Sequence, residues 1–342
     1  MSEGLTVEVL DPRTAPVPEA WDKFVHDGSL APVWRWSVIR AAALGVRVRC
    51  AAAVVQDGQT AVAVAFARLR GQRRLGAGVV EVDCPGTSAL PGIAVAGGHE
   101  GPFGRTPVDL TLLAAAAGAL EAALRREFGG GAGLVWYRGL TANMLPVFLR
   151  NATLTYAGSP VAYLHNRFAD YDAYLATLTK SRRVDQRRLV RRTDDDPAVT
   201  VDWGPAPEGF DTARFYAMTD DTAHRHHRKR FPPARHQPVP VRDALTFDPA
   251  ARVLRYTQDG TMIGCGLTID HPATPVSSAW GALDPREGGR SGIWFDQMAR
   301  VTRWMIESGH AGIIGGKGLA DLKRELGYEP VPQWSVARRL GR

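Results

Sequence analysis

The order of strand-like and helix-like segments, which occurs twice along the chain, constrains the fold more than any other feature. Each half contains an Asp-Gly pair, Asp57-Gly58 in the first half and Asp259-Gly260 in the second. The apolar-rich, strand-like runs on either side are residues 46–55 and 60–69, and residues 252–257 and 261–269. Asp-Gly between two such runs is a strong signal for a β-hairpin, because both residues tolerate the positive φ angles of a tight turn.

Each expected hairpin is followed by a further strand, a helix and another strand. The helices are expected at residues 108–128 and 294–308, and the strands after them at residues 133–138 and 311–315. The short gap between helix and strand is typical of a β-α-β crossover between parallel strands. The chain of 342 residues is long enough for two domains. The repeated order therefore predicts a mixed α/β fold with two similar domains, residues 1–168 and residues 169–342.

Positive charge is concentrated in two segments. The formal net charge is +7, but residues 180–192 alone carry seven Lys or Arg and one Asp, and residues 224–236 carry five Lys or Arg and no acid. The stretch 171–192 predicts a helix that links the two domains, with an apolar inner face at its start. Its continuation from Ser181 contains too few apolar residues for a buried helix and should form a basic surface. Such clusters are expected where a protein binds a phosphate backbone. A solvated helix neutralised by Asp194–Asp196 explains the same pattern.

Several other classes of protein find no support in the sequence. The most apolar stretch, residues 110–124, is too short for a membrane-spanning helix, and the polar, Pro-rich N-terminus does not predict a signal peptide. Cys50, Cys84 and Cys265 are scattered and form no CxxC, which argues against a disulfide framework or a zinc site. No GxSxG, P-loop or paired-carboxylate motif supports a hydrolase or a nucleoside triphosphatase. We therefore expect a cytoplasmic protein without a metal.

Three segments resemble a known family. YLATLTKSRR at residues 174–183 is similar to the family's "yl..l..k.R" segment, and residues 295–309 resemble the helix before its last core strand. LKRELGYEP at residues 322–330 is similar to the family's "K…G(F/Y).p" segment near the C-terminus. Together with the element order, these segments resemble tandem GNAT acyltransferases, namely Fem-type aminoacyltransferases and related BioF2-like acyltransferases. The resemblance implies two GNAT-like domains and transfer of an acyl or aminoacyl group to an amine.

Two donors are compatible with this resemblance. Fem-type enzymes use aminoacyl-tRNA, whose phosphate backbone would give the two basic segments a partner. Acyl-CoA users of this fold hold a pyrophosphate with backbone amides in a Q/R-x-x-G-x-G/A loop before the central helix. The near match in the second half consists of Arg286, Gly288, Gly289, Arg290 and Ser291. These five residues are candidate donor-phosphate ligands, although a plain Gly-rich loop has the same composition.

Lys323 is the first candidate catalytic residue. It matches the Lys of the "K…G(F/Y)" segment, which in Fem-type relatives lies near the reacting carbonyl. The resemblance therefore implies that its ammonium stabilises the oxyanion formed during transfer. Because Lys323 stands between Asp321 and Glu325 in a charged stretch, a helix-surface position explains it equally well.

A run rich in His and Arg supplies further candidates. His227 could accept the proton of the reacting amine. His224 and Arg228, which share a helix face at i and i+4, could bind the acceptor substrate. A metal held by His224 and His227 would lack a third ligand. A solvated helix end before Pro232-Pro233 explains the run as well.

Five other residues are singled out by their positions. Arg182 and Arg183 in the basic helix are candidate substrate-binding residues, as are Trp280 and Gly281 on the strand that leads to the donor loop. Gly281 would let a bound chain approach the backbone closely, while core packing also explains Trp280. Asp296, near the start of the central helix, is best explained as a partner of the helix dipole.

These observations lead to three hypotheses. The first is an enzyme that transfers an aminoacyl group from tRNA to the amine of a small molecule or cell-wall precursor. The second is an acyl-CoA-dependent N-acyltransferase, and the third is a non-catalytic RNA-binding protein on a degenerate GNAT pair. The expected partners are tRNA and a small-molecule amine, with aminoacyl-tRNA or acyl-CoA as co-substrate, no tightly bound cofactor and no DNA. The oligomeric state is left open.

Overall fold

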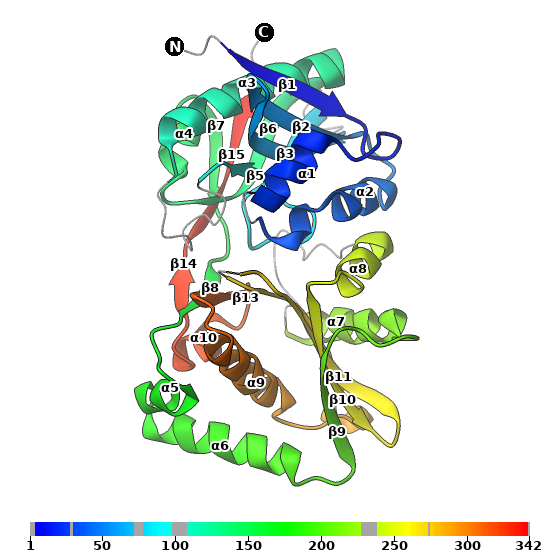
Figure 1. Cartoon of the computed structure of the whole chain (residues 1–342), viewed down its shortest axis with the longest axis vertical. Helices are drawn as coiled ribbons and strands as arrows, with labels where there is room; N and C mark the ends of the chain where they lie inside the picture. The colour runs from blue at the N-terminus through cyan, green and yellow to red at the C-terminus, as the bar shows by residue number, and fades with distance from the viewer. Residues whose placement is uncertain are drawn as a thin grey trace. The chain divides into compact units, whose positions relative to one another are not determined.

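The structure is a computed structural model that describes residues 4–27, 30–71, 78–97, 108–226, 238–272 and 274–340. The chain divides into two compact units. Unit 1 comprises residues 1–161 and 331–342, and unit 2 comprises residues 162–330. Each unit contains one mixed β-sheet packed against helices (Figure 1).

Unit 1 is a sheet of eight described strands with its own core. The strands are β1 (Leu5–Leu10), β2 (Cys50–Asp57), β3 (Thr60–Arg70), β4 (Gly78–Val82), β5 (Ile93–Val95), β6 (Ala132–Thr141), β7 (Ala152–Ala157) and β15 (Gln333–Arg339). The helices are α1 (Glu19–Asp27), α2 (Trp36–Leu44), α3 (Leu110–Phe128) and α4 (Leu145–Leu149). Leu113, Ala117 and Leu120 form a helical stripe on α3 that packs against the sheet, because they recur at spacings of three and four residues.

Unit 2 is a sheet of seven described strands with a separate core. The strands are β8 (Val161–His165), β9 (Val199–Gly204), β10 (Ala251–Gln258), β11 (Thr261–Ile269), β12 (Val276–Ala282), β13 (Gly312–Gly316) and β14 (Glu329–Val331). The helices are α5 (Tyr171–Thr177), α6 (Lys180–Asp194), α7 (Thr212–His226), α8 (Val239–Thr246), α9 (Ile293–Glu307) and α10 (Ala320–Glu325). Helix α9 contributes Ile293, Val301 and Met305 to the core, whereas α7 contacts β11 and β12.

The two sheets have the same strand order. Unit 1 runs β1-β2-β3-β4-β6-β15-β7, and unit 2 runs β9-β10-β11-β12-β13-β8-β14. In both sheets the fourth and fifth strands of this order are parallel, and the long helix α3 or α9 connects them. This match confirms the expected mixed α/β fold with a duplicated domain.

One strand of each sheet comes from an unexpected part of the sequence. β15, at the C-terminal end of the chain, lies between β6 and β7, and β8 takes the equivalent place between β13 and β14. The units therefore differ from the expected domains 1–168 and 169–342. The reason is that backbone pairing with β6 and β7 carries the last strand into the sheet of unit 1.

Both Asp-Gly hairpins form where the sequence predicts them. β2 pairs with β3 up to Asp57 and Thr60, and β10 pairs with β11 up to Gln258 and Thr261. Asp259 and Gly260 both have positive φ angles, 50° and 75°. This left-handed backbone is what a tight hairpin turn needs and what Asp and Gly tolerate best.

The basic helix expected at residues 171–192 is two helices. α5 ends at Thr177, and α6 begins at Lys180, where the hydroxyl of Thr179 accepts a hydrogen bond from Arg182 N at 3.3 Å. Both helices belong to unit 2, and α6 packs against α9. Among the described helices, none is both long and apolar enough to cross a membrane.

Candidate functional site

The parallel strands β12 and β13 leave part of one edge uncovered. Their pairing is confined to one register position, Val276 with Ile314. β13 ends at Gly316 whereas β12 continues to Ala282, so residues 278–282 have no described strand beside them on that side. We call this part of β12 the uncovered edge. Ligands of α/β sheets commonly bind at the carboxyl ends of parallel strands. At the far end of this edge, the Ala282 N–H and carbonyl are bonded to Thr222 and Arg225 of α7.

A β-bulge marks the start of the uncovered edge. Leu267 pairs with Ala279 and Thr268 pairs with Ser277, so Ser278 is the extra residue. A bulge turns a peptide group out of the ladder, and bulges are common beside active sites. The Ser278 hydroxyl is buried and has no hydrogen-bond partner among the described residues. A buried polar group in this state is expected where a ligand or water binds.

A second bulge lies in β13, and its backbone carbonyl binds Lys323. Ile314 pairs with Tyr163 and Gly316 pairs with Ala162, which leaves Gly315 as the extra residue. Lys323 Nζ donates a hydrogen bond to the Gly315 carbonyl at 2.6 Å, and Lys323 is only 6% exposed. An ammonium group is costly to bury without such an acceptor. Lys323 therefore belongs to the interior at the end of β13 and is not a helix-surface charge.

A turn with left-handed backbone brings Lys323 to this position. Gly316, Gly318 and Leu319 have φ angles of 71°, 92° and 50°. Glycine adopts this conformation readily, but a leucine there is strained, and such strain often occurs at functional sites. Lys323 N donates to Leu319 O at 2.9 Å, which closes the first turn of α10. The strained turn thus sets the start of the helix that carries Lys323.

The equivalent strands in unit 1 are arranged differently. β4 pairs with β6 along its whole length, and its register with β3 has no shift. Beyond β4, Gly92 N donates to Arg138 O at 3.0 Å. A β-carbon on Gly139 would lie 2.5 Å from Leu90 O. In unit 1 this segment thus lies against the end of β6, the counterpart of β13. Because no described strand lies beside residues 278–282 of β12, we consider unit 2 for the candidate site.

The loop from Leu283 to Gly292, between β12 and α9, contains the predicted phosphate-binding residues. Its start is fixed by α7, where Arg225 Nη1 donates to Asp284 Oδ2 at 3.0 Å and Thr222 Oγ1 accepts from Ala282 N at 3.1 Å. Asp284 also accepts a hydrogen bond from Arg286 N at 2.9 Å. This backbone donor, together with the Arg225 guanidinium, lowers the pKa of Asp284. The start of the loop is therefore held by hydrogen bonds.

Helix α6 covers the other end of this loop. A β-carbon on Gly292 would lie 2.7 Å from Leu189 Cδ2, and Arg192 donates to the Ser291 carbonyl. Arg290 Nη2 lies 3.1 Å from Asp196 Oδ2. Of the predicted phosphate-binding residues, Arg290 is thus paired with a carboxylate, while Arg286, Gly288 and Ser291 are exposed and Gly289 is half-buried.

Helix α9 carries a buried carboxylate in its first turn. Asp296 is 0% exposed and accepts hydrogen bonds from Tyr256 OH at 2.6 Å and from Arg300 Nε at 2.8 Å. Burial raises the pKa of Asp296 even though both donors act against it. A carboxylate at this position compensates the helix dipole. The first turn of α9 therefore already contains a carboxyl group that is hydrogen-bonded to Tyr256 and Arg300.

The arginines of α6 are partly engaged in ion pairs. The described pairs are Arg182 with Glu325, Arg187 with Asp172, and Arg188 with Asp185. Arg182 Nε lies 2.6 Å from Glu325 Oε2, and its guanidinium lies 5.2 Å from the centre of the Phe295 ring. Arg182 thus ties α6 to α9 and to α10, the helix of Lys323. Arg183 donates to Leu178 O at 3.4 Å and has no described carboxylate partner.

Trp280 and Gly281 lie on the uncovered edge, but their described contacts are with the core and with α7. A β-carbon on Gly281 would lie 2.4 Å from Thr219 N, so this glycine makes room for α7 and not for a substrate. Trp280 packs edge-on against Tyr256, with 6.1 Å between ring centres, at the border of the core. His224 is exposed on α7. His227 and Arg228 lie outside the described residues.

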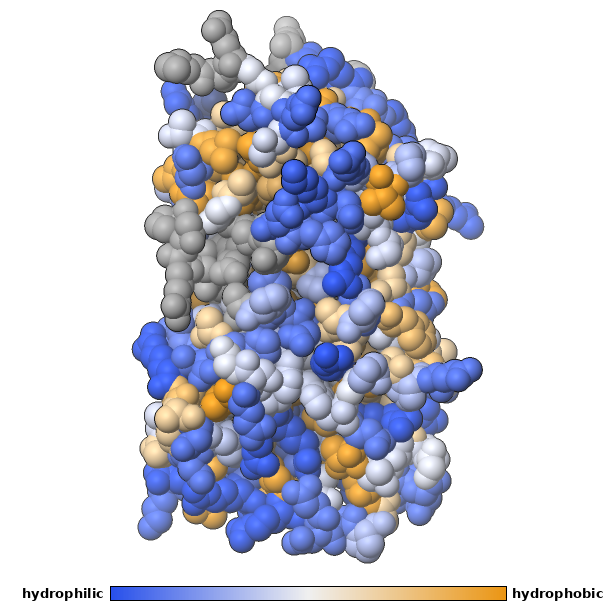
Figure 2. All heavy atoms as spheres, viewed as in Figure 1, coloured by the Kyte–Doolittle hydropathy of each residue, from blue (hydrophilic) through white to orange (hydrophobic). Residues whose placement is uncertain are grey.

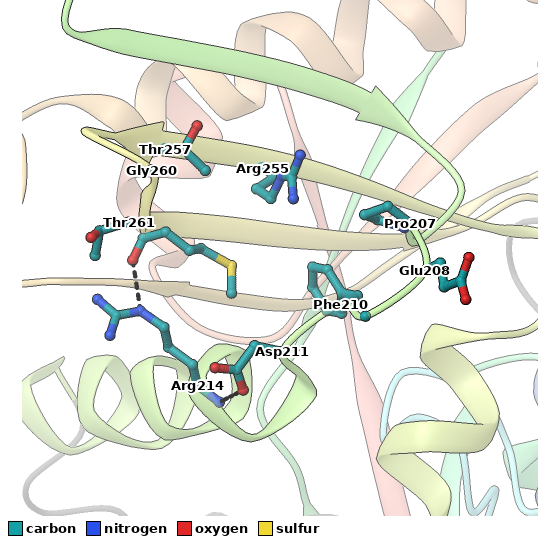
Figure 3. A pocket seen from close by; sticks show the side chains of 11 residues that line it. Pro207, Glu208, Phe210, Asp211, Arg214, Arg255, Thr257, Gly260 and Thr261 are labelled. Carbon is teal, nitrogen blue, oxygen red and sulfur yellow. Dashed lines mark hydrogen bonds between the residues drawn. The ribbon is translucent and has the colours of Figure 1, made fainter.

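A shallow hollow of about 310 Å³ lies elsewhere in unit 2 (Figure 3). It is lined by the loop before α7 and by the β10–β11 hairpin. Arg214 Nε donates to Met262 O at 3.0 Å, and Arg255 Nη2 donates to Asp202 Oδ2 at 2.8 Å. None of the predicted site residues lines this hollow, and β12 separates β11 from β13 in the sheet. We therefore do not include it in the site.

The described residues contain no group of three or more His, Cys, Asp or Glu side chains placed to hold a metal ion. The three cysteines are buried and unbridged. Desolvation raises the pKa of Cys84 to about 12, so this thiol stays protonated at neutral pH and is a poor nucleophile.

Comparison with known proteins identifies the fold. No protein-family model and no curated protein matches the sequence. The structure of FemX is similar with a TM-score of 0.58 and 11% identity over 96% of each chain. The structure of L-PGS from Bacillus licheniformis has a TM-score of 0.58 and 13% identity, covering 96% of this chain and 93% of that one. The chain has the fold of these proteins.

A third structure extends the likeness. The C-terminal domain of a putative lysylphosphatidylglycerol synthetase from Agrobacterium fabrum matches with a TM-score of 0.55 and 12% identity, over 94% of this chain and 91% of that domain. The predicted resemblance to Fem-type proteins is thereby confirmed at the level of the fold. The likeness covers both units and thus the whole tandem arrangement.

Two residues of the candidate site, Ser278 and Gly315, could not be predicted from the sequence. Both are bulged residues, and a bulge depends on the register between strands that are distant in sequence. The only local signals are Ser277-Ser278, which interrupts the apolar residues of β12, and the pair Gly315-Gly316 at the end of β13.

Proposed function

We propose that the protein is an N-acyltransferase whose transfer centre lies in unit 2, at the uncovered edge of β12. The observation that carries this proposal is the buried Lys323 ammonium, held on the bulged Gly315 carbonyl at the carboxyl end of β13. The bulge at Ser278 lies on the neighbouring strand, and in unit 1 residues 90–92 lie against β6, the counterpart of β13. A cation, together with peptide groups that the two bulges turn out of the strand ladder, is suited to stabilise an oxyanion.

The reaction at such a centre is direct transfer. The amine nitrogen of the acceptor attacks the carbonyl carbon of the donor's ester or thioester, and the carbonyl oxygen takes up negative charge. Lys323 stabilises that oxygen. The bond to the leaving oxygen or sulfur then breaks, an amide remains, and the amine proton passes to a base and on to the leaving group. His227 stays the proposed base, with His224 and Arg228 as proposed acceptor ligands.

The loop before α9 favours aminoacyl-tRNA over acyl-CoA as the donor. A pyrophosphate at the N-terminus of a helix needs free amides and no competing negative charge. Here Leu189 and Arg192 of α6 lie against Gly292, Asp196 pairs with Arg290, and Asp296 is buried in the first turn of α9. The chain shares the fold of FemX and L-PGS, which agrees with the Fem-type resemblance of its sequence. The proposed acceptor is the amine of a small molecule or of a cell-wall precursor.

A transfer assay tests the proposal and separates the donors. The protein is incubated with a mixture of charged tRNAs, acetyl-CoA and candidate amines, with and without prior RNase treatment. We expect amide product that RNase abolishes. If product still forms after RNase treatment and free CoA appears with it, the donor is acyl-CoA and not aminoacyl-tRNA. Salt-dependent tRNA binding without transfer to any amine would contradict the proposed enzymatic activity. It would favour a non-catalytic RNA-binding protein.

A further inference from the structure

The first turn of α9 carries two aromatic rings that stay partly exposed. Trp294 and Phe295 are half-buried at the border of the core, with 4.9 Å between their ring centres. Successive residues on a helix point about 100° apart, so the two rings cannot both face the sheet. We call Trp294 and Phe295 the aromatic pair. Large rings that remain at the surface together are typical of a binding surface.

The aromatic pair lies on the flank of α9 that faces β13 and α10. Asp296 accepts a hydrogen bond from Tyr256, which places the opposite flank over β10. At 100° per residue, Trp294 points about 160° away from Asp296 around the helix. In the sheet, β13 lies on the other side of β12 from β10. The Phe295 ring agrees with this direction, because the Arg182 guanidinium over it also binds α10.

Along the helix axis, the aromatic pair is level with the end of β12. A β-carbon on Gly264 would lie 2.8 Å from Ile293 Cδ1, and Gly264 pairs with Ala282, the last residue of β12. Trp294 follows Ile293 directly in the chain. The aromatic pair therefore stands at the carboxyl end of the uncovered edge, beside the proposed transfer centre.

Helix α6, which packs against α9, supplies positive charge next to the aromatic pair. It contains seven Lys or Arg and two Asp, and hydrophilic residues cover most of the surface over it (Figure 2). Arg182 lies over the Phe295 ring. A β-carbon on Gly292 would lie 3.1 Å from Arg192 Nη2. Aromatic rings beside guanidinium groups bind single-stranded nucleic acid, because bases stack on the rings and phosphates pair with the cations.

We propose that Trp294 and Phe295 form the stacking platform for the unpaired bases at the 3′ end of the donor tRNA. This inference rests on the proposed aminoacyl-tRNA donor. The aminoacyl ester is carried by the terminal ribose of a tRNA, so the last unpaired bases must lie close to the carbonyl that reacts. A base stacked on Trp294 holds that ester at the uncovered edge, while the arginines of α6 bind the phosphates that follow.

Binding of two forms of one uncharged tRNA tests the platform. One form has an intact 3′ end, and the other is trimmed of its unpaired 3′ nucleotides. We expect the parent protein to bind the intact form about tenfold more tightly, the effect of stacking one or two bases. Because this comparison uses the parent protein, it does not depend on the stability of any variant.

Variants of Trp294 assign the effect to the ring. Trp294→Leu should lower the affinity for the intact tRNA about tenfold and leave the affinity for the trimmed tRNA unchanged. The loss should be equal at low and high salt, because stacking does not change the number of phosphate contacts. Trp294→Tyr keeps a ring and should retain most of the affinity. Trp304→Leu is the matched control, since Trp304 is also half-buried on α9 but contacts Trp203 and His310.

Thermal melting verifies that each variant is folded. Equal affinity of the parent for intact and trimmed tRNA would overturn the proposal, and so would a Trp294→Leu variant that binds both forms as the parent does. If Trp294→Leu weakened binding of acetyl-CoA and not of tRNA, the ring would serve the adenine of CoA, which also overturns the proposal.

The binding measurements are independent of transfer activity. A parent that recognises the 3′ end through Trp294 but transfers nothing would support the platform and contradict the proposed enzyme. RNase-sensitive transfer, with the parent's tRNA affinity in Trp294→Leu, would contradict the platform alone.

Discussion

At the scale of single residues, Gly281 shows how closely α7 approaches the sheet of unit 2. A β-carbon there would lie 2.4 Å from Thr219 N and 2.7 Å from Met218 C, both backbone atoms that cannot turn aside. We expect Gly281→Ala to lower the free energy of unfolding by about 1–3 kcal/mol, because α7 must shift. Denaturant titration checks this. Gly204→Ala, where the added carbon meets nothing within 4 Å, is the control.

If Gly281→Ala were as stable as Gly204→Ala, the close packing of α7 on β12 would be contradicted. The position matters for the candidate site because α7 also holds the end of β12, where the loop from Leu283 to Gly292 begins, through Thr222 and Arg225. A substitution that moves α7 should therefore disturb that loop as well as the core.

Asp296 makes a second prediction at the residue scale. Burial raises its pKa in the folded protein, so the folded state holds this proton more tightly than the unfolded state. The contribution of Asp296 to stability is therefore most favourable at acidic pH and declines as pH rises through the raised pKa. Asp296→Asn cannot ionise and keeps an acceptor for Tyr256. We expect its stability relative to the parent to increase from acidic to neutral pH.

Urea unfolding at a series of pH values measures this difference. A variant that loses stability relative to the parent as pH rises would show that the Arg300 and Tyr256 contacts outweigh burial. Arg300 keeps Asp194 as a partner in the variant, which limits the cost of losing the Asp296 charge.

At the scale of elements, α6 contains arginines with a described carboxylate partner and arginines without one. Arg187 and Arg188 have carboxylate partners, whereas none is described for Arg183 or Arg191. We expect replacing Arg183 and Arg191 by Gln to reduce the salt slope of tRNA binding by about 2, roughly one unit per lost phosphate contact. Replacing Arg187 and Arg188 should change the slope less.

Binding measured over a range of salt concentrations compares the two double variants. If both double variants kept the salt slope of the parent protein, α6 would be an ordinary solvated helix with no role in tRNA binding. Arg182 is set apart from this test because it joins Glu325 of α10 and the Phe295 ring. Its loss should act on transfer through the position of Lys323.

Local features predicted the elements well, and non-local ones could not be predicted. The hairpins followed from Asp57-Gly58 and Asp259-Gly260, since turn conformation is set by the turn residues themselves. The bulges at Ser278 and Gly315 depend on partner strands. The break of the basic helix between Thr177 and Lys180 comes from a cap at Thr179 inside a stretch that remains helical in composition.

At the scale of the whole molecule, the two units share one sheet order but differ in how the fourth and fifth strands pair. The sequence repeat predicted the duplication, but not that β15 would join the sheet of unit 1, because nothing local distinguishes one antiparallel partner from another. Lys323 was predicted from the family resemblance. Its burial on Gly315, and the contacts of residues 90–92 with β6 in unit 1, support the proposal that the transfer centre lies in unit 2.

The central claim is that the Lys323 ammonium stabilises the oxyanion at the uncovered edge of β12. The most direct measurement is the single-turnover rate of amide formation in Lys323→Met, with thermal melting to verify the fold. Arg324→Gln is the control, because Arg324 is the next residue on α10 but is exposed and paired with Asp321. We expect Lys323→Met to slow transfer about 100-fold or more and Arg324→Gln to match the parent. A folded Lys323→Met variant with the parent's rate would contradict the claim.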